Sequence, residues 1–184
     1  MVIKQSGARL VTMSNLYGYA KNSSPMRATD PLDPPSTKGA IRVQMWNEAL
    51  AAHETGRVRV TELRASDYFG PGLGDSAHLG DRVVPKAAKG KGVGVVGDPE
   101  ASHSWTYIGD VCAMLAILGT DDRALGRAWH VPTVAPRSAT HMVADISASA
   151  GVKAAKVACA LIHKVGLLLQ SNGEVTQWST APFT

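Results

Sequence analysis

Short apolar strands alternate with amphipathic helices along this 184-residue chain, and this alternation is the feature that most limits its fold. Val58, Val60 and Leu63 indicate a strand, and the helix before it is bounded by Ser36, a capping residue, and Gly56, a stop residue. The pattern predicts strands at 10–13, 58–63, 93–96, 129–131 and near Val157, and helices at 36–55, 81–89, 110–119 and 138–150 with a last one ending at Leu169. Such alternation is typical of an α/β fold with some parallel pairing.

Helical spacing also predicts which side chains are buried. In the helix after Ser36, the apolar residues that recur at helical spacing mark the expected buried face: Ile41, Met45, Ala49 and Ala52. Asp110 is expected to cap the helix that follows it. Cys112 and Cys159 lie in apolar runs, so we expect both to be reduced and buried, as in a cytoplasmic protein.

Composition excludes several classes of partner. The net charge of +4 comes from dispersed Lys and Arg, with one local group at Lys86, Lys89 and Lys91. No aromatic residue lies between these lysines, which favours a solvated helix end over a nucleic-acid groove. No apolar run reaches the roughly 18 residues of a membrane span, and residues 1–11 lack the apolar core of a signal peptide. We therefore expect neither a nucleic acid nor a membrane as a partner.

Two short motifs match known chemistry in spacing alone. Gly92, Gly94 and Gly97 fit GxGxxG, but a turn follows them where a dinucleotide site needs a helix. Tyr17 and Lys21 fit YxxxK, which places a phenol beside an ammonium only on a helix, whereas this stretch leads into a loop. The histidines are scattered without metal-ligand spacing, so no metal site is expected.

Four segments, in order, resemble the extended, atypical short-chain dehydrogenase/reductase family, also called the NAD-dependent epimerase/dehydratase family. SNLYG at 14–18 is similar to the S-x-x-V-Y-G end of the family's fifth strand, and 37–40 to the end of its Y-x-x-S-K element. Residues 64–72 resemble the R-x-x-N-x-Y-G-P-G loop, and 97–111 the segment G-D-G…R-D-F-x-x-V-x-D-V.

The resemblance implies the second half of a Rossmann-like, doubly wound parallel sheet, interwoven with a small α/β substrate domain. Residues 1–66 would be the C-terminal half of the NAD(P)-binding domain, and residues 67–184 the substrate-binding region. The chain would then begin just before the fifth strand, without the glycine-rich turn that holds the cofactor diphosphate. We expect it to be inactive when isolated.

The resemblance also assigns roles to individual residues. Lys38 matches the family's lysine and would hold the nicotinamide ribose of NAD or NADP. Ala65 and Ser66 would lie beside the nicotinamide as further cofactor-binding residues. Asp67, His103 and Trp105 would contact the substrate; His103 stands where sugar-nucleotide epimerases have a phosphate-gripping arginine, which disfavours a nucleotide-sugar substrate.

Two departures from the family affect catalysis. Met13 stands at the family's catalytic Ser or Thr, and Pro34 at its catalytic tyrosine. Because proline cannot transfer a proton, Tyr17 or Tyr19 would have to replace it. Three hypotheses follow: part of an NAD(P)-dependent epimerase, dehydratase or reductase acting on a small or sugar-like substrate, a non-catalytic relative that senses a dinucleotide or small ligand, or an interaction domain. A homodimer is also expected.

Overall fold

The computed structural model describes residues 7–21 and 25–159, and these divide into two units. Unit 1 takes the part of the chain up to Ser66 together with Thr106–Thr133. Unit 2 takes Asp67–Trp105 and the part from Val134 onward. The chain therefore passes between the units three times, and each unit combines segments that lie far apart in the sequence.

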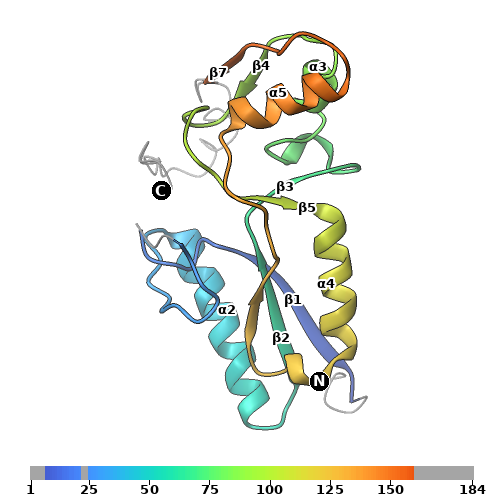
Figure 1. The fold of residues 1–184 in the computed structure, drawn as a ribbon. Helices are drawn as coiled ribbons and strands as arrows, with labels where there is room; N and C mark the ends of the chain where they lie inside the picture. The colour runs from blue at the N-terminus through green and yellow to red at the C-terminus, as the bar shows by residue number, and fades with distance from the viewer. Residues whose placement is uncertain (1–6, 22–24, 160–184) are drawn as a thin grey trace. The chain divides into compact units, whose positions relative to one another are not determined.

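Unit 1 is built on a parallel three-stranded sheet with the order β1-β2-β6 (Figure 1). The strands are β1 (Arg9–Asn15), β2 (Arg59–Ala65) and β6 (Ala128–His130). β1 and β2 pair along their whole length, from Arg9 opposite Arg59 to Asn15 opposite Ala65. Their carboxyl ends consequently lie side by side at one edge of the sheet.

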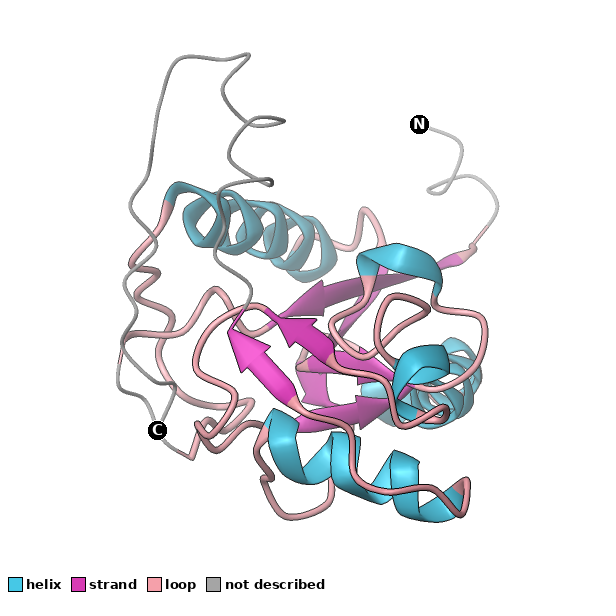
Figure 2. Cartoon of the chain, turned by 90° about the horizontal axis from the view of Figure 1, so that it is seen from above, coloured by secondary structure: helices cyan, strands magenta, loops and turns pink. Residues whose placement is uncertain are grey.

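Two helices cover the faces of this sheet, α2 (Thr37–Glu54) on one side and α4 (Ile108–Thr120) on the other (Figures 1 and 2). Trp46 of α2 packs with Val58 and Val60 to form the core on its side of the sheet. The Ser36 hydroxyl accepts a hydrogen bond from the backbone N–H of Gly39, which confirms the predicted cap. The mixed α/β class with parallel pairing is thus confirmed.

The predicted buried face of α2 is wrong in its first half. Ile41 and Met45 are 52% and 53% exposed, whereas Trp46 is 7% exposed. The tryptophan ring has far more apolar surface to remove from water than its neighbours, so it sets the rotation of the helix on the sheet. Ala49 and Ala52 still contact the core, because Ala49 follows Trp46 by three residues and Ala52 follows Ala49 by three.

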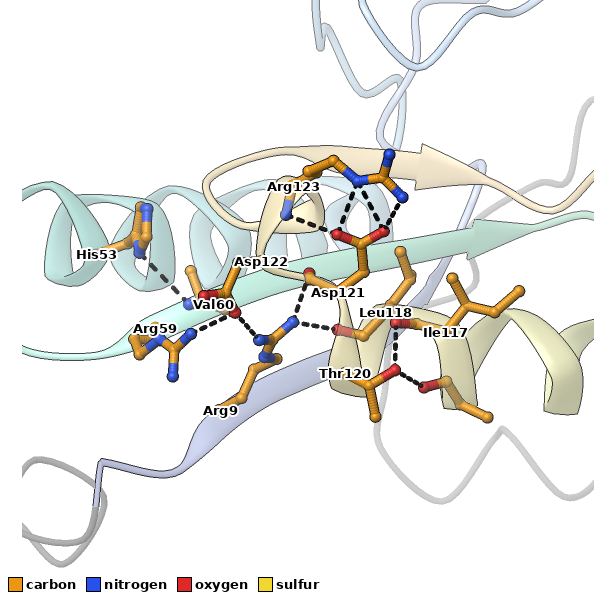
Figure 3. Close-up of polar contacts among 11 residues, drawn as sticks. Arg9, His53, Arg59, Val60, Ile117, Leu118, Thr120, Asp121, Asp122 and Arg123 are labelled. Carbon is orange, nitrogen blue, oxygen red and sulfur yellow. Dashed lines mark hydrogen bonds and ion pairs between the residues drawn. The ribbon is translucent and has the colours of Figure 1, made fainter.

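The two ends of α4 are fixed differently from the expectation. The helix begins at Ile108, so Asp110 lies inside its first turn and is not the cap. At the other end, Arg9 donates to the carbonyl oxygens of Leu118 (3.0 Å) and Asp121 (2.5 Å) and forms an ion pair with Asp122 (Figure 3). Asp122 opens a short 3-10 turn, η2 (Asp122–Ala124). One strand arginine thus stabilises the exposed carbonyl end of the helix.

Unit 2 contains short elements around its own core. In chain order they are β3 (Asp67–Phe69), η1 (Gly74–Ser76), α3 (Val84–Ala87), β4 (Val93–Val95), α5 (Ala139–Ser149) and β7 (Val157–Cys159), while the chain passes to unit 1 within β5 (Trp105–Tyr107). β4 and β7 pair in parallel. The core of unit 2 includes Leu79, Val83, Val93, Trp105 and Val143.

Other predictions for the second half of the chain have mixed outcomes. Ser138 caps α5 as expected, by accepting from the backbone N–H of His141. Cys112 and Cys159 are free but exposed, so the prediction that they are buried is wrong. Each cysteine lies on the exposed side of its helix or strand, and a short apolar run in the sequence does not show which side a residue takes. The helix predicted to end at Leu169 lies outside the described residues.

Within residues 7–21 and 25–159, no helix combines the length and the apolar character needed to cross a bilayer.

Gly39 allows α2 to approach the chain that leaves β1, and replacing it with alanine should destabilise unit 1. A Cβ at this position would lie 2.2 Å from the carbonyl oxygen of Tyr17 and 2.7 Å from Cβ of Pro34. We expect Gly39→Ala to lower the free energy of unfolding by about 1–3 kcal/mol, the usual cost of overpacking. The measurement is urea unfolding followed by circular dichroism.

Gly119→Ala is the matched control, because a Cβ at this position of α4 meets nothing within 4 Å. Alanine favours helix over glycine, so this variant should be unchanged or more stable by up to about 1 kcal/mol. Equal stability of the Gly39→Ala variant and the parent would refute the steric role of Gly39.

Candidate functional site

Unit 1 has a candidate site at the carboxyl ends of β1 and β2. Asn15 and Ala65 face each other as the last pair of the two strands, and Ser66 follows directly. The Ser66 hydroxyl lies 2.8 Å from the Thr106 hydroxyl, which is fully buried. In open parallel sheets, ligands bind beyond the carboxyl ends of the strands, so Ala65 and Ser66 occupy a position suited to a ligand.

Lys38 belongs to the same end of the sheet. It is an exposed residue in the first turn of α2, directly before Gly39. Gly39 packs against the carbonyl of Tyr17, and Tyr17 follows the end of β1 by two residues. The start of α2, which carries Lys38, therefore lies beside the end of β1, the strand that pairs with β2 up to Ala65.

Tyr17 and Tyr19 have different environments. Tyr19 is 2% exposed, and its hydroxyl accepts from Nη1 of Arg64 and lies 2.7 Å from Nε2 of His130. Burial raises the pKa of Tyr19, although Arg64 opposes this. Tyr17 is 40% exposed, and no helix spans 17–21, so the YxxxK spacing does not place Tyr17 one helical turn from Lys21.

A buried ion pair supports this end of unit 1. Nε of Arg64 donates to Oε1 of Glu62 at 2.6 Å, and both side chains are almost fully buried. The guanidinium also lies over the rings of Tyr19 and Trp46. Burial raises the pKa of Glu62, while the hydrogen bond and charge of Arg64 oppose that rise. Removal of either partner would leave an uncompensated buried charge.

Unit 2 holds a second candidate site of its own, a polar cluster. Nε2 of His103 donates to Oδ2 of Asp67 at 2.9 Å, and Nδ1 of His78 lies 3.9 Å from the same oxygen. The ring of Trp105 contacts both imidazoles edge-on, at centroid distances of 4.6 Å to His103 and 5.5 Å to His78. The structure thus brings together Asp67, His103 and Trp105, which the sequence analysis proposed as substrate-binding residues.

The cluster holds one carboxylate between two imidazoles. Burial alone would raise the pKa of Asp67, but the hydrogen bond from His103 and the charges of both histidines outweigh it and lower that pKa. Burial lowers the pKa of His78, and Asp67 opposes this shift. Asp67 is therefore ionised at neutral pH, and His78 favours its neutral form.

Arg137 supports the cluster from the other side of His103. The backbones of His103 and Arg137 exchange two hydrogen bonds, and the indole N–H of Trp105 donates to the Arg137 carbonyl at 2.8 Å. The Arg137 side chain pairs with Asp145 at 2.6 Å. Trp105 is 3% exposed, so it buttresses His103 from the core. Sequence reasoning missed His78 and Arg137, which reach the cluster only through the fold.

The glycine motif at 92–97 does not form a dinucleotide turn. Its glycines lie in and around β4, and residues 96–104 contain no helix. In the part of the chain that the structure describes, no group of three or more His, Cys, Asp or Glu side chains could hold a metal ion.

Comparison with known proteins points in one direction. The sequence model of the NAD dependent epimerase/dehydratase family matches residues 1–131. No curated protein matches the chain.

Solved structures with the same fold cover most of this chain. A dTDP-glucose 4,6-dehydratase from Streptomyces venezuelae, with NAD and TYD bound, is 19% identical with a TM-score of 0.67, over 83% of this chain and 48% of its own. A UDP-N-acetylglucosamine 4-epimerase from Methanobrevibacter ruminantium M1 is 16% identical with a TM-score of 0.70, over 83% and 50%. A UDP-glucose 4-epimerase from Thermus thermophilus in complex with NAD is 22% identical with a TM-score of 0.66, over 85% and 53%. The chain spans about half the length of these structures, and the likeness confirms its Rossmann-like fold.

Acid should destabilise the protein through His130. Burial, reinforced by the charge of Arg64, lowers the pKa of His130, so the folded chain holds fewer protons than the unfolded chain as pH falls through about 6.5. The free energy of unfolding should therefore decrease from pH 7.5 to pH 5.5. In His130→Gln, whose amide can still accept from Tyr19 but does not titrate, the decrease should be smaller. Urea unfolding at each pH measures both.

His78, whose pKa is also lowered, and Glu62, whose raised pKa acts in the opposite direction, titrate in the parent and in the variant alike. Only the difference between the two pH dependences reports on His130. Parallel curves for the two proteins would contradict its role.

Proposed function

Because the chain belongs to the NAD-dependent epimerase/dehydratase family, we propose that it forms the C-terminal, substrate-binding portion of an NAD(P)-dependent epimerase, dehydratase or reductase. The observation that carries this proposal is the packing of Gly39, the residue after Lys38, against the Tyr17 carbonyl, just beyond the strand end at which Asn15 of β1 pairs with Ala65 of β2. The proposed substrate is small or sugar-like.

The residues at this strand end fit one half of a nicotinamide dinucleotide. The ammonium of Lys38 would donate to the ribose hydroxyls next to the nicotinamide, and Ala65 and Ser66 would line the ring. When bound, the nicotinamide accepts and returns a hydride. The described residues contain no glycine-rich strand–turn–helix for the diphosphate, so their contribution is confined to the nicotinamide ribose half, and NAD and NADP fit it equally.

Tyr17 is the proposed proton donor and acceptor. Pro34 stands at the position of the family's tyrosine. A Cβ built on Gly39 would lie 2.7 Å from Cβ of Pro34 and 2.2 Å from the carbonyl oxygen of Tyr17. These two atoms are thus at most about 4.9 Å apart, the sum of the two distances. Tyr17 is exposed at this point, whereas the hydroxyl of Tyr19 is enclosed by Arg64 and His130.

Asp67 and His103 are the proposed substrate-binding pair. The ionised carboxylate accepts from hydroxyl groups, as sugar recognition requires, and the imidazole offers a second polar contact. Trp105 would hold His103 in place from the core. The dehydratase and epimerase of similar fold are named for nucleotide sugars. Histidine lacks the paired N–H donors with which an arginine guanidinium binds phosphate, so we propose that the substrate of this chain has no tightly held diphosphate.

A sensing role is the second candidate function, and Pro34 favours it. A relative that binds a dinucleotide or small ligand without turnover keeps Lys38 and needs no proton donor at position 34. Turnover that depends on Tyr17 in the protein expressed from its full coding sequence would favour the enzyme, and binding without turnover would favour the sensor. The free cysteines suit a reducing compartment such as the cytoplasm, the proposed location.

Cofactor binding tests the role of Lys38. Since only the nicotinamide ribose half is provided for, we expect NADH to bind the 184-residue chain with a Kd above about 1 mM, a binding free energy weaker than about −4 kcal/mol. Reduced nicotinamide mononucleotide should bind about as tightly as NADH. Lys38→Ala should weaken its binding about 10- to 150-fold, the effect of losing a charged hydrogen bond of about 1.5–3 kcal/mol. Chemical-shift titration by NMR is the measurement.

Arg57→Ala, which removes an exposed cation at the far end of α2, is the matched control and should leave binding unchanged. Micromolar binding of NADH, or equal loss in both variants, would overturn the proposed site.

A second copy of the chain is the proposed partner of the outer face of α2. Ile41 and Met45 lie one turn apart and are each more than half exposed, a pair of large apolar side chains that a homodimer would cover. If they lie in the dimer interface, the double variant Ile41→Lys, Met45→Lys should sediment as a monomer under conditions where the parent is a dimer. A dimer that persists in the variant would rule out this face.

A further inference from the structure

Unit 2 carries a basic face that the sequence shows only in part. We define it by six exposed residues: Arg82, Lys86, Lys89, Lys91, Lys153 and Lys156. The first four lie within 82–97 and the last two within 146–159, and neither segment contains an acidic residue. A local lysine group is usually a solvated helix end, but this face joins two distant segments.

The fold holds these segments together by specific contacts. The Ser147 hydroxyl donates to the Ala87 carbonyl at 2.9 Å, which ties α5 to α3. The backbone N–H of Val93 donates to the carbonyl of Lys156 at 2.9 Å, at the start of the β4–β7 pairing (Figure 1). Gly90, with φ +63°, lies between Lys89 and Lys91 and packs against Lys153, because a Cβ on Gly90 would be 3.2 Å from the Lys153 carbonyl oxygen.

The basic face accounts for the net charge of the whole chain. It holds six of the 19 Lys and Arg residues, which leaves 13 basic residues against 15 acidic ones elsewhere. Among the described residues, none of the ion pairs involves a residue of the basic face. Asp81 adjoins it next to Arg82, and Asp145 at its border is paired with Arg137. Uncompensated charge of one sign attracts a partner of the opposite sign.

We propose that the basic face binds an acidic segment of a partner protein. Five of the six cations are lysines, whose ammonium groups on flexible stems each pair with a separate carboxylate and offer no rigid fork for a phosphate. Neither segment contains an aromatic residue on which bases could stack. Val96 is the single large apolar side chain exposed on these segments, too little to insert into a bilayer.

Each exposed ion pair contributes little alone, so the partner must present several acidic residues in a row. The interaction should be fast and strongly dependent on salt, because charge steers the encounter. None of the six residues of the basic face is among those proposed to bind cofactor or substrate, so failure of this proposal leaves the proposed function untouched.

A fluorescein-labelled peptide of ten glutamates tests the proposal on the full 184-residue chain, with fluorescence anisotropy as the readout. We expect saturable binding at 20 mM salt that weakens at least tenfold at 200 mM salt. The double variant Lys89→Glu, Lys153→Glu should bind at least tenfold more weakly. Lys86→Glu, Lys156→Glu provides a second variant, should the first fail to fold by circular dichroism.

The control Arg27→Glu, Arg57→Glu makes the same change of net charge on exposed residues of unit 1 and should alter binding less than twofold. An equal loss in this control would overturn the proposal, because binding would then follow net charge alone. Tighter binding of a 20-base-pair DNA duplex, or of vesicles with 30% phosphatidylserine, would overturn it in favour of a nucleic-acid or lipid partner.

Discussion

Seven consecutive parallel pairs between β1 and β2 are the constraint on which unit 1 depends. A slip of one residue would turn Val60 and Leu63 to the opposite faces of the sheet and expose what α2 and α4 now cover. The same register places Asn15 beside Ala65, so the candidate cofactor residues meet because the strands end together. At the other end of β1, Arg9 belongs to the first pair of this register and donates to the Leu118 carbonyl oxygen at the end of α4. Packing and the candidate site are therefore two outcomes of one alignment.

The elements that the sequence predicted well are those whose signals are local. Ser36 and Ser138 cap α2 and α5 as expected, because a capping hydroxyl acts on an N–H three residues away. The rotation of α2 was predicted wrongly, since periodicity alone gives Ile41 the same weight as Trp46. Asp110 failed as a cap for a related reason: two residues before it already satisfy helical geometry. Local patterns locate an element, but tertiary packing decides which side faces the core.

The residues of the candidate sites also differ in whether their signal is local or arises only from the fold. Lys38, Asp67 and His103 were proposed from the sequence because each belongs to a segment that resembles the family. His78 and Arg137 were not, because they lie 25 and 34 residues from His103 in the sequence, and contacts over such separations leave no local signal. The basic face is a third case: its first lysines form a visible group, but Lys153 and Lys156 join them only through the β4–β7 pairing.

Burial separates two tyrosines that the sequence leaves equivalent. Tyr19 is fixed by Arg64 and His130, which both contact its hydroxyl and its ring, and its phenol is more stable protonated, so it is suited to holding the strand ends together. Tyr17 keeps its side chain at the surface while its carbonyl anchors Gly39. Because a proton-transfer group must reach its substrate, the exposed phenol of Tyr17 is better suited to that role than the buried phenol of Tyr19. Because Pro34 stands at the position of the family's tyrosine, the exposed phenol of Tyr17 is the one that we propose for proton transfer.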